Sequence, residues 1–245
     1  MDSFPILIAV AGAYLVAGFV KGGIGMGLPT VAIGVLGFLM TPAQAAAILL
    51  VPSLATNIWQ FVVGGNLLAL VRRLWPLLAG ICIGTFIGAA LLPRGQGATL
   101  WLGLALVIYA ALGLVKIQLK VPLHAETWLG LLMGTATGVV TVATGIFVMP
   151  GTPYIQAMEF ERDRLVQALG LSFTTSTVTM ALALGYAGEI NATLVWPALV
   201  ALGAALIGMS FGQTVRRMVS AETFRLWFFS GLLVIGASLT LRGLL

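Results

Sequence analysis

A lysine beside a cluster of glycines is the feature of this sequence best suited to bind a ligand. Residues 21–29 read Lys-Gly-Gly-Ile-Gly-Met-Gly-Leu-Pro and follow about 15 mostly apolar residues. Glycines break a helix and leave backbone N–H groups unpaired. A helix that begins near Pro29 would direct its positive end at that break. We predict that an anion binds here to the Lys21 ammonium and the backbone of Gly22, Gly23, Gly25 and Gly27.

A second, fainter break lies in the other half of the chain. Residues 141–145 read Thr-Val-Ala-Thr-Gly, and Pro150 and Pro153 follow. We expect a second half-helix to begin after Gly145 and to point its N-terminus at the same anion from the opposite side. Thr141, Thr144 and Gly145 are the residues predicted to contribute to the site from this break, which we place near the middle of the membrane.

Two stripes of polar residues have the spacing of one helix face. Ser53, Thr56, Asn57 and Gln60 recur at i, i+3, i+4 and i+7, and Ser172, Thr175, Ser176 and Thr179 repeat the pattern. Hydrogen bonding between helices would explain the Ser and Thr residues equally well. Asn57 and Gln60 are costlier near the middle of a span, so the stripes also fit a water-accessible pathway. We predict that Asn57, Gln60, Thr175 and Thr179 line the substrate cavity.

Each of these predictions has a simpler structural alternative. Lys21 could extend its ammonium to the membrane interface, although it lies deep for that escape. Glycines allow helices to approach closely, and this reading suits Gly84, Gly88, Gly208 and Gly212 well. It suits the clustered glycines at 22–27 less well.

Composition excludes several classes of function. Of the 245 residues, 60% are hydrophobic and 8% are charged, and the mean hydropathy is +1.11, whereas soluble domains carry about 25% charged residues. A soluble enzyme or nucleic-acid binder is therefore excluded, although the net charge is +5. The sequence contains no metal-ligand spacing and no catalytic motif, so we expect no enzyme activity, cofactor or metal. The single cysteine, Cys82, excludes an internal disulfide, and the N-terminus lacks the basic region of a signal peptide.

Continuous apolar segments predict an all-α, polytopic membrane protein built from two repeats. Residues 5–40 and 127–158 contain the two breaks, and each is followed by three plain spans. Gly18 and Gly25 match Gly138 and Gly145 at an offset of 120, and Trp75-Pro76 matches Trp196-Pro197 at 121. We assign the repeats to residues 1–120 and 121–245, which together form one transport domain. The six plain spans are predicted at 43–64, 74–92, 98–116, 164–187, 191–213 and 222–242.

Charge placement predicts that the repeats are inverted. If each broken segment enters and leaves the membrane on the same side, one side of the membrane collects nine basic residues and the other keeps two, Arg94 and Arg242. This partition obeys the positive-inside rule. If each broken segment instead crossed the membrane once, the basic residues would divide five against six. An odd number of crossings per half then inverts the second repeat, an architecture typical of transporters. Both termini are expected on the periplasmic side. The nine residues are Arg72, Arg73, Lys116, Lys120, Arg162, Arg164, Arg216, Arg217 and Arg225.

The length, the eight apolar segments and the first glycine-rich break resemble the TauE/SafE sulfite exporter family. The resemblance implies a multi-pass protein of a bacterial inner membrane that exports small sulfur-containing anions, such as sulfite, sulfonates or sulfoacetate, by alternating access. The second break departs from the family by keeping one glycine. An uncoupled anion channel and a non-transporting membrane subunit remain alternatives. The expected partners are the substrate and the lipid bilayer. Whether protons are the coupling ion stays open, as does the oligomeric state.

Overall fold

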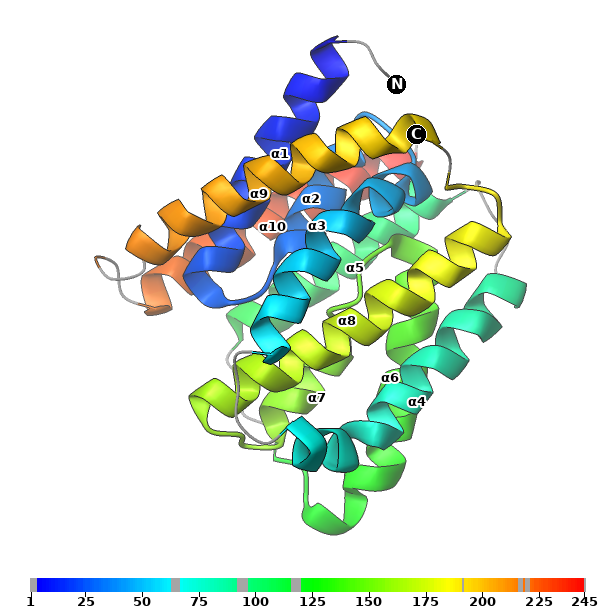
Figure 1. The fold of residues 1–245 in the computed structure, drawn as a ribbon, viewed down its shortest axis with the longest axis vertical. Coiled ribbons are helices and arrows are strands. Elements are labelled where there is room, and N and C mark those ends of the chain that lie inside the picture. The colour runs from blue at the N-terminus through cyan, green and yellow to red at the C-terminus, as the bar shows by residue number, and fades with distance from the viewer. Residues whose placement is uncertain are drawn as a thin grey trace. The chain divides into compact units, whose positions relative to one another are not determined.

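The computed structural model describes residues 4–62, 67–91, 97–115, 120–190, 192–215, 218 and 221–244. Every regular element within these ranges is a helix (Figure 1). The all-α prediction is confirmed. The helices are α1 (Phe4–Ile24), α2 (Leu28–Leu36), α3 (Pro42–Val62), α4 (Leu67–Leu91), α5 (Ala98–Leu114), α6 (Glu126–Thr144), α7 (Gly151–Ala157), α8 (Arg162–Tyr186), α9 (Val195–Val215) and α10 (Ala221–Leu244), with 3-10 turns at Leu123–Ala125 and Ala192–Leu194.

Each of the six predicted plain spans corresponds to one helix. Within the described ranges, seven helices are long and apolar enough to cross a membrane, and α5 is shorter at 17 residues. The largest error concerns α4, which begins at Leu67 rather than at residue 74. Arg72 and Arg73 therefore lie inside a helix, where their long side chains can still reach the interface.

The first broken segment is a full-length helix followed by a short one. Helix α1 has 21 residues, or about 32 Å, and ends where Gly25 and Gly27 adopt positive φ angles of 79° and 99°. Helix α2 begins at Leu28 with Pro29 in its first turn, as predicted, and packs back against α1. The segment is thus a hairpin whose break follows a helix long enough to span the hydrocarbon layer.

The second broken segment differs from its prediction. Gly145, at φ 76°, ends α6 as expected, but the next helix begins only at Gly151 and has seven residues. Pro150 explains the delay, because it cannot donate a backbone hydrogen bond and disfavours a helical conformation at Met149. Ile146, Phe147 and Val148 in the intervening stretch are 2%, 2% and 0% exposed.

The chain divides into two compact units that interleave along the sequence. The first unit contains Met1–Pro52, Pro93–Ile117 and Leu184–Leu245, and the second contains Ser53–Leu92 and Gln118–Ala183. Each unit therefore holds helices from both sequence halves. The chain passes from one unit to the other within α3, immediately after Pro52, and within α8, after Ala183.

In the first unit, glycines bring α1 and α9 into backbone contact. A Cβ atom on Gly18 would lie 2.2 Å from the carbonyl oxygen of Ala205, and one on Gly208 would lie 2.1 Å from that of Leu15. Because Gly22 and Gly212 repeat this pattern one turn later, the two helices run parallel. Helix α5 packs along α10 in the opposite sense, with Gly103 near Thr240 and Gly113 near Phe229.

The second unit repeats this packing with α4 and α6, which lie side by side in Figure 1. A Cβ atom on Gly84 would lie 2.0 Å from the carbonyl oxygen of Thr135, and one on Gly138 would lie 2.4 Å from that of Ile81. These helices also run parallel. The packing interpretation of the glycines on α4 and α9 is confirmed by these contacts.

The exposed side chains are of the kinds expected for a membrane protein. All six tryptophans are between 57% and 65% exposed. Exposed tryptophans near helix ends are typical of the two membrane interfaces. Many leucine, isoleucine and valine side chains between them are also exposed, as expected of a surface that faces lipid.

Candidate functional site

Helix α1 buries a tyrosine and a lysine on one face. Lys21 lies in the last turn of α1 and is 3% exposed, and Tyr14 lies seven residues earlier at 0%. A spacing of seven residues places both side chains on the same face. The Tyr14 hydroxyl has no hydrogen-bond partner among the described residues. This face therefore buries a hydroxyl donor at the middle of α1 and a lysine in its last turn.

The four glycines predicted around Lys21 have two different roles. Gly22 and Gly23 are packing residues, because Cβ atoms there would lie 2.2 Å from the Met209 carbonyl oxygen and 2.2 Å from the Phe224 ring. Close packing therefore applies at these two positions, where the sequence favoured ligand binding. Gly25 and Gly27 are instead required by their positive φ angles.

The backbone donors of this break agree only in part with those that the sequence suggested. The amide of Gly25 donates to the carbonyl oxygen of Lys21 at 2.8 Å and so ends α1. No hydrogen bond from the amides of Met26 and Gly27 occurs within the described part of the chain. The N-cap Gly27 provides no side-chain cap for α2. The available donors thus lie at residues 26 and 27 and in the first turn of α2.

In the second unit, the first polar stripe packs against α8. The Ser53 hydroxyl lies 3.0 Å from that of Thr177 on α8, and the Asn57 amide donates to Ser53 at 2.9 Å. A Cβ atom on Gly170 of α8 would lie 2.8 Å from the Cβ of Gln60 on α3. Ser53 of the first stripe therefore forms an interhelical hydrogen bond, as the simpler reading expected, but its partner Thr177 lies outside the second stripe. The role of the stripes in a pathway stays a prediction.

The predicted threonines use their hydroxyl groups within their own helices. Thr141 and Thr144 each donate to a carbonyl oxygen four residues earlier at 2.7 Å. Thr175 donates in the same way at 3.1 Å, and Thr179 donates at 2.9 Å to the Thr175 carbonyl oxygen and lies 3.4 Å from Thr85 of α4. An approaching anion would have to turn these hydroxyl groups away from the backbone.

The amide of Gly145 is engaged as well. It donates to the Thr141 carbonyl oxygen at 2.7 Å, and the amide of Ile146 donates to the Thr144 hydroxyl at 3.1 Å. The prediction of unpaired donors at residues 144 and 145 is therefore wrong, because a left-handed glycine caps the helix that it ends. The next three amides, of Phe147, Val148 and Met149, form no hydrogen bond within the described residues. The break of the second unit thus presents its donors three residues later than predicted.

Two buried hydroxyl groups near this segment also have no partner among the described residues. They belong to Ser176, which is 0% exposed, and Thr152, which is 2% exposed. The Phe147 ring lies 5.6 Å from that of Phe173, one turn before Ser176 on α8. Ser176 belongs to the predicted stripe, whereas nothing in the local sequence distinguishes Thr152 or Tyr14.

The two breaks thus supply hydrogen-bond donors of several kinds. Groups of three or more His, Cys, Asp or Glu side chains that could bind a metal are absent from the described residues. An ammonium group, hydroxyl groups and backbone amides are hydrogen-bond donors that are suited to bind an anion. The shared site of both breaks stays a prediction, because they belong to different units.

The profile of the sulfite exporter TauE/SafE family matches residues 10–239. The chain belongs to the TauE/SafE family. No curated protein and no solved structure shows significant similarity to it. As a TauE/SafE protein it is a multi-pass membrane transporter of sulfite-type anions rather than an enzyme, which agrees with a buried set of donors and an apolar surface.

Proposed function

We propose that this TauE/SafE protein transports small sulfur-containing oxyanions, such as sulfite, sulfonates or sulfoacetate, across a bacterial inner membrane. The buried donors carry this proposal. Lys21 and Tyr14 lie on one face of α1, and the amides of 147–149 lie in the second unit with the Ser176 hydroxyl. The Tyr14 and Ser176 hydroxyl groups and these amides have no partner among the described residues, so an anionic ligand with several oxygen atoms would stabilise the donors of either unit. A sulfonate or sulfite group presents three oxygen atoms at its sulfur.

Alternating access is the mechanism that we infer for this transport. Transporters with repeated halves commonly move one bundle of helices against another around a fixed site. The chain has two compact units, and α3 and α8 pass from one into the other. Pro52, at the point where α3 leaves the first unit, removes one helical hydrogen bond and is a position where a helix can bend.

Uptake into proteoliposomes tests the substrate class. We expect sulfite and sulfoacetate to enter at rates that saturate with concentration, and acetate and chloride to enter much more slowly. A proton gradient applied across the same vesicles shows whether protons are the coupling ion. A flux that rises linearly with sulfite concentration would instead identify an uncoupled channel, and absence of flux for every sulfur anion would contradict the proposal.

We also infer that the two sequence repeats are inverted in the membrane. The contacts within the units make α1 parallel to α9, α4 parallel to α6, and α5 antiparallel to α10. Consecutive spans joined by short loops cross in opposite directions, which applies to α4 with α5 and to α9 with α10. Helix α1 then crosses in the direction of α5 and against α6, so the second repeat is inverted.

Thiol labelling from each side of the membrane checks this topology. Cysteine is placed at Lys120, before α6, or at Ile190, before α9, in a Cys82→Ser background; both positions are exposed. We expect a membrane-impermeant reagent to label Ile190→Cys in intact cells with the outer membrane permeabilised, and Lys120→Cys only in inside-out vesicles. Labelling of both positions from one side would contradict the inverted arrangement.

A further inference from the structure

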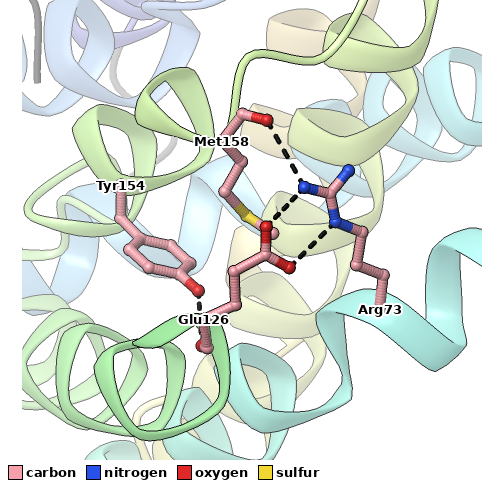
Figure 2. Close-up of polar contacts among 4 residues, drawn as sticks. All are labelled: Arg73, Glu126, Tyr154 and Met158. Atoms are coloured by element: carbon pink, nitrogen blue, oxygen red, sulfur yellow. Dashed lines mark hydrogen bonds and ion pairs between the residues drawn. The ribbon is translucent and has the colours of Figure 1, made fainter. Parts of the chain in front are cut away.

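A polar cluster in the second unit joins the ends of three elements. The Arg73 guanidinium on α4 forms a two-pronged ion pair with Glu126, the first residue of α6, with one Nε–Oε2 distance of 3.0 Å. It also donates to the Met158 carbonyl oxygen, just after α7, at 3.5 Å. Figure 2 shows Arg73 between these two acceptors, with the Tyr154 hydroxyl of α7 directed at the Glu126 backbone oxygen, 2.6 Å away.

The cluster is more than an ordinary surface ion pair. The Glu126 side chain is 12% exposed, and the planar guanidinium lies 4.5 Å from the Phe160 ring centre. Two parallel hydrogen bonds fix the orientation of arginine and carboxylate as well as their distance. By contrast, Lys120 and Glu159 form an ion pair with side chains that are 73% and 60% exposed, and such pairs contribute little.

Packing of α4 on α6 does not require this ion pair. The glycine contacts of α4 with α6 recur between α1 and α9. By the offsets of the repeat, the positions that correspond to Glu126 and Arg73 are Ile6 and Leu194, which are apolar. The ion pair is therefore an addition to a packing that works without it, and its distinctive contacts are those to α7 and Met158.

Helix α7 needs such an anchor because the segment before it has few hydrogen bonds of its own. Residues 147–149 form no backbone ladder within the described residues. Their position depends on α6 at one end, through Gly145 and Ile146, and on the seven-residue α7 at the other. We propose that Arg73 and Glu126 are positioning residues that hold α7 and thereby keep the amides of 147–149 in place for the substrate.

This proposal rests on the proposed anion transport. Its test includes the labelling rate of a cysteine, which can be measured whether or not the protein transports anions. Val148, 0% exposed, is replaced by cysteine in a Cys82→Ser background as a reporter of local opening. We expect Glu126→Gln to raise its labelling rate about tenfold, the change that follows from a loss of about 1.4 kcal/mol in local stability. The KM for sulfite should rise severalfold while the maximal rate per folded protein changes little. Lys120→Gln, which removes the exposed pair, is the matched control and should change neither quantity.

A second reporter separates positioning from general loosening. Ile33→Cys on α2 of the first unit is also 0% exposed in the parent protein, and its labelling should stay slow in Glu126→Gln. Faster labelling at both reporters, or at neither, would overturn the proposal. If Glu126→Gln yields no folded protein, Tyr154→Phe replaces it; that variant removes only the hydrogen bond to Glu126, and an unchanged Val148→Cys rate would again overturn the proposal. A parent protein that carries no sulfite would refute the transport proposal and leave the labelling result valid.

Discussion

Replacing Lys21 by methionine should lower the affinity for sulfite at least about tenfold. The ammonium group is the only full positive charge among the predicted ligands, and Lys21 is 3% exposed. A hydrogen bond to a charged group contributes about 1.5–3 kcal/mol, and 1.4 kcal/mol corresponds to a factor of ten. Methionine preserves an unbranched side chain and removes the charge. Calorimetric titration of the purified protein with sulfite measures the change.

Two further variants on the same helix separate the contribution of the charge from that of the hydroxyl group. Lys21→Arg keeps the charge and should retain part of the affinity. Tyr14→Phe removes only a buried hydroxyl group that has no partner among the described residues. It should weaken sulfite binding but raise the melting temperature without substrate, because a buried unsatisfied polar group costs about 1–3 kcal/mol. Unchanged sulfite binding in Lys21→Met would assign Lys21 a purely structural role and place the site elsewhere.

Replacing Gly208 by alanine should destabilise the protein by about 1–3 kcal/mol or more. Its Cβ atom would lie 2.1 Å from the carbonyl oxygen of Leu15 and 2.9 Å from the amide nitrogen of Phe19. Both neighbours are backbone atoms, so α1 and α9 would have to move apart as whole helices. Thermal unfolding of the detergent-purified protein measures the loss.

Gly203 on the same helix provides the matched control. A Cβ atom at Gly203 would meet nothing within 4 Å, and alanine is about 1 kcal/mol more favourable than glycine inside a helix. Gly203→Ala should therefore unfold at the same temperature as the parent protein or slightly above it. Equal melting temperatures for Gly208→Ala and Gly203→Ala would contradict close packing of α1 on α9.

The sequence by itself determined the features that depend on local chemistry. Long apolar runs require helices in a membrane, because hydrocarbon provides no partners for the backbone. The helix after Gly27 starts at Leu28 with Pro29 in its first turn, as glycine and proline dictate locally. The buried position of Lys21 followed from the length of the apolar sequence before it.

Errors arose where two local signals competed. Gly145 ended α6 as expected, but the proline at position 150 postponed the next helix to Gly151. Gly25 and Gly145 were expected to offer free amides, whereas each amide caps its own helix. A helix end satisfies its own carbonyl oxygens first, so the unpaired amides lie farther along the chain.

Only the tertiary structure decided which polar side chains have partners. Arg73 was one of two adjacent basic residues in the sequence, and its partner Glu126 lies 53 positions away. The hydroxyl groups of Ser53 and Thr177, 124 positions apart, form a hydrogen bond, whereas the hydroxyl groups of Tyr14 and Ser176 have no partner among the described residues. Local sequence fixes where a side chain lies on its helix. A hydrogen bond between helices depends instead on which distant helix packs against that position. In a buried position the presence or absence of this partner changes the stability, because a buried polar group without a hydrogen bond is costly.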